Sequence, residues 1–288
     1  MKLVECIDAA SFLERTETYR ERTPWLTNVI GSVALSVADG VRTYDHHRWW
    51  VVEERDEVIL AAMRTAPHPV SLGPGPTAAA QLVGAVVAQG ADDTEGFNGP
   101  EHVVNAALVG YQSTSSKGSR REARITRRDV VYVLEGLRTP DVTGAARRAE
   151  LADEEIVLKW VRDFHDELDI PHVSLEGNLA RLAQGSFWLW HNNGLPVSLA
   201  GYASAVATPS GAITRIGPVY TPVPHRGHGF AAGVTAAVCR EITTSGSSVM
   251  LYADADNPTS NGVYQRLGFA HVDDVISLSM LTKAIEPS

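Results

Sequence analysis

Residues 214–269 decide the fold, and at their centre stands Pro222-Val-Pro-His-Arg-Gly-His-Gly229. The apolar run before it ends in Val219-Tyr220-Thr221 and is typical of a β-strand, and the small residues of 231–240 after it predict a helix. Glycines before a helix let the backbone approach an anion closely, where the helix dipole and free N–H groups favour negative charge. The stretch therefore predicts a phosphate-binding loop, with a pyrophosphate as its natural ligand.

A glycine-rich turn between a strand and a helix is common, and alone it favours a simple connection. Three features favour the binding loop: Pro222 and Pro224 stiffen the approach, Arg226 brings a fixed cation, and small residues keep the first helical turns thin. The spacing excludes two other phosphate loops. A Walker loop needs Lys-Ser/Thr where this chain has Phe230-Ala231, and a dinucleotide fingerprint needs three glycines and a downstream acid.

Arg226, Gly229 and Ala231 match the pattern Arg/Gln-x-x-Gly-x-Gly/Ala in register. In this pattern the stretch resembles the acetyl-CoA loop of the GCN5-related N-acetyltransferases (GNAT). The run 216–222 is similar to that family's splayed central strand, whose backbone pairs with the pantetheine arm. The run 256–269 is similar to its Asn...Tyr-x-x-x-Gly-Phe segment. Three motifs in the same order make the resemblance specific, and helix and strand patterns extend it to residues 150–288.

The resemblance implies acetyl-CoA (CoA) as cofactor and no metal. It assigns cofactor binding to Val219, Tyr220, Thr221, Arg226, Gly227, His228, Gly229, Phe230, Ala231, Asn257 and Asn261. Two of these keep a second interpretation, since Asn261 also suits the end of a strand and a loop histidine such as His228 is more often only exposed.

Tyr264 is the catalytic residue that the resemblance implies, because the family's tyrosine faces the cofactor sulfur. A phenol with a pKa near ~10 can hydrogen-bond the departing thiolate and protonate it. The alternative is a core tyrosine whose hydroxyl binds a backbone group. Neither Cys6 nor Cys239 favours a covalent route, so direct transfer in a ternary complex is expected. The general base stays unassigned among Glu167, Glu176, His172 and His225.

The composition limits the partners. A net charge of −9 argues against nucleic acid, and 119–128 is the one basic run, which is expected to be an exposed connection. Two cysteines give no disulfide framework, the N-terminus lacks the pattern of an export signal, and no run approaches the ~20 apolar residues of a membrane span. We expect a cytoplasmic monomer or homodimer that contacts neither nucleic acid nor membrane.

The element pattern predicts an α/β (α+β) chain with a mixed, mostly antiparallel central sheet flanked by helices, and it suggests two tandem GNAT-like domains. Helices are expected at 153–168 and 175–183, and the Asn-Gly pair at 193–194 predicts a hairpin. The N-terminal half repeats the order with a helix at 77–89, but its loop Gly73-Pro-Gly-Pro76 lacks the arginine and two amide donors. The predicted domains are 1–136 (degenerate), a linker 137–152, and 153–288 (acetyltransferase).

The function that follows is an acetyl-CoA-dependent N-acetyltransferase, which is an acyltransferase that moves an acetyl group to a primary amine. The acidic balance suits a cationic small molecule, a polyamine or a peptide amine, although net charge says little about a local pocket. The alternative is a CoA-binding regulatory module without turnover. Such a module needs the loop but has no need of an acid at the sulfur.

Overall fold

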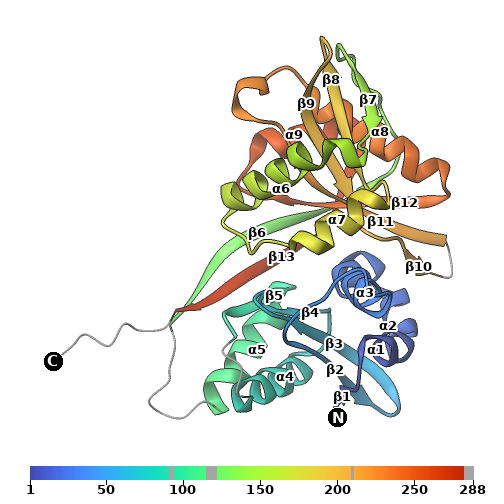
Figure 1. Cartoon of the computed structure of the whole chain (residues 1–288). Helices are drawn as coiled ribbons and strands as arrows, with labels where there is room; N and C mark the ends of the chain where they lie inside the picture. The colour runs from blue at the N-terminus through green and yellow to red at the C-terminus, as the bar shows by residue number, and fades with distance from the viewer. Residues whose placement is uncertain (91–93, 115–121, 209–210, 282–288) are drawn as a thin grey trace. The chain divides into compact units, whose positions relative to one another are not determined.

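A computed structural model describes residues 1–90, 94–114, 122–208 and 211–281 of the chain. The described residues form two compact units. Unit 1 contains residues 1–38, 44–129 and 273–281, and unit 2 contains residues 39–43 and 130–272. Figure 1 shows the helices and strands of both.

Unit 1 holds the elements of the N-terminal half together with one strand from the end of the chain. In chain order they are β1 (Lys2–Cys6), α1 (Ala9–Arg15), α2 (Glu17–Arg22), α3 (Pro24–Ala38), β2 (His47–Glu54), β3 (Glu57–Thr65), β4 (Val70–Leu72), α4 (Thr77–Gln89), β5 (Gly96–Gly99) and α5 (Glu101–Thr114). The strand order is β1-β2-β3-β4-β5-β13, where β13 is Phe269–Leu281. All neighbours are antiparallel except β4 and β5, which are parallel.

Both faces of the unit 1 sheet are covered, because neighbouring residues of a strand point to opposite sides. Trp50 and Ala62 pack in one cluster with α4 and α5, whereas Trp49 and Ala61 pack in another with α1 and α3. The helix predicted at 77–89 is confirmed as α4. The short strands β1 and β4 are additions to the sequence-based assignment.

Unit 2 carries the stretch that decided the fold. Its elements are β7 (Ala145–Arg148), α6 (Glu154–Leu168), α7 (Leu175–Ala183), β8 (Phe187–Asn192), β9 (Leu195–Tyr202), β10 (Val206–Thr208), β11 (Gly211–Tyr220), α8 (Phe230–Thr244), β12 (Ser247–Asp254) and α9 (Pro258–Leu267). The strand order is β6-β12-β11-β9-β8-β7, where β6 is Glu122–Leu134, and β10 pairs with β11. Here β11 and β12 are the parallel pair.

The core of unit 2 follows the same rule of alternating faces. Leu199 packs with α6 and α7 on one face of the sheet, and its neighbour Ala200 packs with α8 and α9 on the other. The helix predicted at 175–183 is confirmed as α7. The hairpin prediction is also confirmed, since Asn193 and Gly194 join β8 to β9 with φ values of 50° and 78°.

The last strand of each half completes the sheet of the other unit. Residues 130–134 of β6 lie in unit 2, where Tyr132 joins the core, and residues 273–281 of β13 lie in unit 1, where Ile276 and Leu278 are buried. We call this arrangement the strand exchange. Because of it, the limits of the units differ from the boundaries 1–136, 137–152 and 153–288 drawn from the sequence. The division into a degenerate domain, a linker and an acetyltransferase domain stays a prediction.

The predicted fold class is confirmed: helices flank a mixed, mostly antiparallel sheet in two units whose order of elements is similar, apart from a third early helix in unit 1 and the extra strand β10 in unit 2. Among the helices that the structure describes, none is long and apolar enough to cross a membrane. Part of the basic run 119–128 lies outside the described residues, and its described part belongs to β6.

Candidate active site

The site begins where two parallel strands part. The pairing of β11 with β12 runs from Ala212 opposite Ser247 to Ile216 opposite Leu251. Beyond that point β11 continues to Tyr220 and β12 to Asp254, while β11 stays paired with β9 on its other edge. The β12-facing edge of 217–220 therefore has backbone groups that the ladder does not use, which is what an extended ligand needs.

Side chains on the far edge hold the end of β11 in place. The buried Ser198 hydroxyl of β9 donates to the Tyr220 carbonyl at 3.1 Å and shares a hydrogen bond with the Thr221 hydroxyl at 2.8 Å. The Arg226 Nε donates to the Thr221 carbonyl at 2.9 Å. Carbonyls of this short segment are thus satisfied from the β9 and loop side. Sequence reasoning missed Ser198, and its one signal was a polar residue inside an apolar strand.

The loop after β11 ends at the N-terminus of α8. Gly227 and Gly229 have φ values of 81° and 78°, in the left-handed region that glycine adopts without strain. Gly229 is the N-cap, and having no side chain it leaves the first N–H groups of the fifteen-residue helix α8 without a cap. A Cβ atom on Gly229 would lie 3.1 Å from Val142 Cγ2. The helix end is therefore open to an anion but too narrow for a bulky residue.

The Arg226 side chain contacts α6 and the end of β11 rather than the glycines that follow it in the loop. Its Nη2 donates to Glu167 Oε2 on α6 at 2.6 Å, and its Cζ lies 6.0 Å from the centre of the Tyr220 ring. The hydrogen bond to Glu167 raises the pKa of Arg226. The arginine therefore fixes the loop against β11 and α6.

The residues around Gly229 form a small ordered group. The His228 ring stacks on Phe230 with 5.4 Å between ring centres, and its Nδ1 lies 2.8 Å from the Arg226 carbonyl. Phe230 is buried, whereas Ala231 is partly exposed in the first turn of α8. The predicted loop residues are thus brought together at the end of β11.

Tyr264 lies on α9, half-buried against the core that α8, β6 and β13 share. Its ring contacts Tyr132 and Phe269, with centres 6.2 Å and 5.9 Å apart. Burial raises the pKa of Tyr264 to about 12, and the nearby Cys239 adds to the effect. A raised pKa keeps the phenol protonated at neutral pH, which is the state that a proton donor needs.

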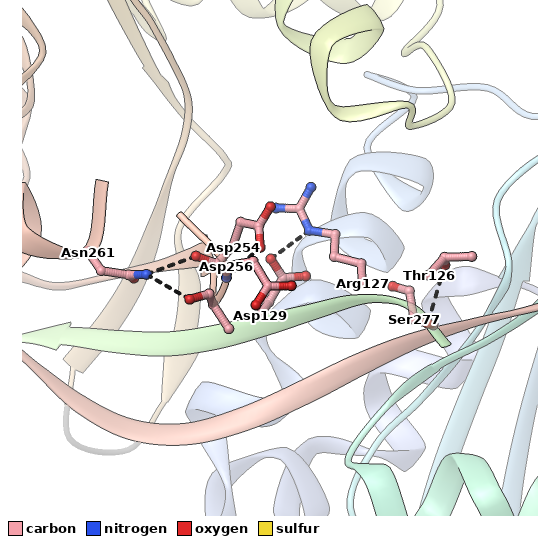
Figure 2. A network of polar contacts seen from close by, with 8 residues as sticks. Thr126, Arg127, Asp129, Asp254, Asp256, Asn261 and Ser277 are labelled. Atoms are coloured by element: carbon pink, nitrogen blue, oxygen red, sulfur yellow. Dashed lines mark hydrogen bonds and ion pairs between the residues drawn. The ribbon is translucent and has the colours of Figure 1, made fainter. Parts of the chain in front are cut away.

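Asn257 and Asn261 shape the turn between β12 and α9. Asn257 is the N-cap of α9, and its Oδ1 accepts from the Ser260 N–H at 3.0 Å. The Asn261 amide donates to the Asp254 carbonyl at 2.9 Å (Figure 2). It also donates to the Asn257 carbonyl at 2.9 Å. Both asparagines therefore have structural partners, and their contact with a cofactor stays a prediction.

The four candidate bases occupy different settings. Glu167 binds Arg226, and the exposed His172 Nε2 lies 3.0 Å from Asp166 Oδ1. Glu176 lies in the first turn of α7, and His225 lies in the turn 223–225 before the loop. Glu167 is thus held in an ion pair with a cation, whereas His172 has a carboxylate beside it.

The corresponding loop of unit 1 is filled by a side chain. The Tyr19 hydroxyl donates to the Pro74 carbonyl at 2.6 Å, and a Cβ atom on Gly73 would lie 2.2 Å from that hydroxyl. The Tyr19 hydroxyl therefore fills the space beside this loop. This agrees with a degenerate N-terminal half.

Comparisons with known proteins agree with this geometry. Residues 200–276 match the family described as FR47-like protein. No curated protein matches the chain. Among solved structures, the chain is similar over 98% of its length to all of a GNAT-family acetyltransferase from Colwellia psychrerythraea, with 10% identity and a TM-score of 0.59.

Two further structures extend the likeness over both units. A GCN5-related N-acetyltransferase from Sphaerobacter thermophilus has 15% identity and a TM-score of 0.62, covering 99% of this chain and 98% of its own. A tandem GNAT protein from the clavulanic acid biosynthesis pathway has 11% identity and a TM-score of 0.56, covering 99% and 100%. The resemblance to GCN5-related N-acetyltransferases is therefore confirmed: the chain has the tandem GNAT fold.

Proposed function

We propose that unit 2 binds acetyl-CoA and transfers its acetyl group to a primary amine directly, in a ternary complex. The observation that carries this proposal is the parting of β11 from β12 after Ile216, immediately before the uncapped N-terminus of α8. The extended pantetheine arm of the cofactor fits the first feature, and its pyrophosphate fits the second. The arm needs free backbone groups along a strand, and the pyrophosphate needs N–H groups at a helix end.

The residues divide into three groups along this path. Val219, Tyr220 and Thr221 would present backbone to the arm. The loop from Arg226 to Ala231, namely Arg226, Gly227, His228, Gly229, Phe230 and Ala231, would surround the pyrophosphate. Asn257 and Asn261 would face the arm from the β12 side, in addition to shaping their turn.

Tyr264 supplies the proton in this proposal. The bound thioester supplies an activated acyl group, whose transfer to an amine needs positioning more than an enzyme nucleophile. Tyr264 Oη would hydrogen-bond the departing sulfur and donate its proton to it, because burial raises the pKa of Tyr264 to about 12 and the phenol is protonated at neutral pH. The amine loses its own proton to a base or to water. Cys239 is buried with its pKa raised to about 12, so it stays a thiol.

The acceptor is a primary amine on a small molecule or peptide, and the protein is expected to act in the cytoplasm as a monomer or homodimer. A thiol-release assay with acetyl-CoA and a panel of primary amines tests the activity. Thiol release that depends on both substrates and falls in Tyr264→Phe supports the proposal. CoA binding without release for any amine would instead favour a regulatory module.

A further inference from the structure

A side chain from α7 bridges the irregularity in β11. The register between β11 and β9 shifts between Ile216 and Val219, so that Gly217 and Pro218 stand opposite the single residue Gly201. Such a bulge interrupts the ladder of backbone hydrogen bonds. Arg181 Nη2 donates across it, to the Tyr202 carbonyl of β9 at 3.0 Å and to the Gly217 carbonyl of β11 at 2.9 Å.

We propose that Arg181 is a positioning residue for acyl transfer: its guanidinium replaces the ladder bonds lost at the bulge and fixes the residue at which β11 leaves β12. The inference rests on the proposed function, since it explains how the open edge at 219–221 keeps the geometry that the acyl carrier needs. Arg181 is expected to affect cofactor binding without touching the cofactor.

The position of the clamp agrees with this role. Pairing with β12 ends at Ile216, and the clamped carbonyl belongs to the next residue, Gly217. Pro218 follows and has no N–H to offer either neighbouring strand. The Arg181 guanidinium therefore supplies the donor that joins β9 to β11 at this point. Without it, β11 would be free to shift in register against β9 at the residue where the site begins.

Burying the Arg181 cation costs free energy, which favours a role in positioning β11 over a role in stabilising the fold. Its side chain is only 7% exposed, and within the described residues its hydrogen bonds go to neutral carbonyls while Nε has no partner. A buried cation with incomplete compensation is unfavourable for stability. Burial, with repulsion from Arg42 and Arg215, lowers the pKa of Arg181 to about 9, so it remains charged at neutral pH.

Two neighbours make room for the guanidinium. Its Cζ lies 4.6 Å from the centre of the buried Phe187 ring, a cation–π contact. A Cβ atom on Gly201 would lie 3.2 Å from Arg181 Nη2 and 2.7 Å from Phe187 Cδ1. The glycine opposite the bulge thus leaves the space that the clamp fills.

The test compares Arg181→Met with Arg20→Met. Arg20 on α2 is a matched control in unit 1, because its Nη2 also donates to a backbone carbonyl, that of Leu13, at 2.9 Å, and burial lowers its pKa as well. Circular dichroism first shows that both variants are folded. Only Arg181→Met is expected to raise the Kd for CoA and the KM for acetyl-CoA, by about tenfold, because preorganisation is lost.

The outcomes separate the clamp from the proposed function. Wild-type Kd and KM values in folded Arg181→Met, or an equal rise in Arg20→Met, would overturn the clamp while leaving the proposed function intact. A wild-type protein that binds no CoA would overturn both. If Arg181→Met does not fold, Gly201→Ala, whose Cβ atom would displace Arg181 Nη2, is measured in the same way, and wild-type constants in that folded variant would overturn the clamp.

Discussion

Arg226 and Glu167 form an ion pair of 2.6 Å that ties the loop before α8 to the helix α6. Both side chains are more than two-fifths exposed, so we expect the pair to contribute no more than about 1 kcal/mol to stability. Its importance lies in orientation, since the same guanidinium also holds the Thr221 carbonyl at the end of β11.

Replacing Glu167 tests its role as a base. Glu167→Gln is expected to leave kcat within about twofold of wild type, because the carboxylate is already engaged with Arg226 and its role is to hold the loop. Steady-state kinetics across pH, with Glu176→Gln measured alongside, provide the check. A fall in kcat of about a hundredfold together with loss of the acidic limb would identify Glu167 as the base.

Replacing Tyr264 tests the proton donor. Tyr264→Phe is expected to lower kcat by about a hundredfold while the Kd for CoA stays within about twofold, because the lost hydroxyl acts only on the departing sulfur. Burial raises the pKa of Tyr264 to about 12, so its proton is retained through pH 10 and its loss slows the wild type only as pH nears 12.

Tyr132→Phe serves as the control for Tyr264→Phe. Tyr132 lies in the same cluster, and its hydroxyl accepts a hydrogen bond from Gln265 Nε2 at 3.2 Å. Its turnover should match that of wild type. Unchanged turnover in Tyr264→Phe would remove Tyr264 from the acid role.

Asn261 is expected to matter for stability whether or not it binds cofactor. Asn261→Ala removes an amide that donates to two carbonyls, and we expect the free energy of unfolding to fall by about 1 to 3 kcal/mol. The N-cap variant Asn257→Ala should cost about 1 kcal/mol. Denaturant unfolding measures both values. An unchanged free energy in Asn261→Ala would show that its bonds do not support the turn.

The strand exchange predicts how the chain tolerates cutting. A fragment of residues 153–288 lacks Tyr132 of β6 and exposes Ile276 and Leu278, which unit 1 buries. We expect this fragment to aggregate when expressed alone and to form a complex with residues 1–152 when both are co-expressed. Circular dichroism and size-exclusion chromatography provide the readout, and a monomeric, cooperatively folding 153–288 would contradict the exchange.

Sequence reasoning found the features that local signals specify. The loop at 226–231, the turn at 193–194 and Tyr264 on α9 depend on neighbours in the chain, and so their patterns were visible. Arg181 was missed because its partners, Tyr202 and Gly217, are brought near it only by the packing of α7 on the sheet.

The strand exchange was missed for a similar reason. A continuous apolar run rich in valine, such as 130–134, predicts a strand, but it does not say which neighbour the strand will pair with. The short strand β7 was also overlooked, since Ala145–Arg148 has no apolar alternation and owes its structure to pairing with β8.

The most direct test of the account is a calorimetric titration with CoA of three proteins: wild type, Gly229→Val and Gly246→Val. Gly246 follows the other end of α8 with a φ of 83° and open space around a Cβ atom, so its replacement carries a similar backbone strain away from the loop. We predict wild-type affinity in Gly246→Val and at least about tenfold weaker binding in Gly229→Val, which obstructs the open helix end. Equal affinity in all three proteins, or no binding by wild type, would contradict the cofactor site.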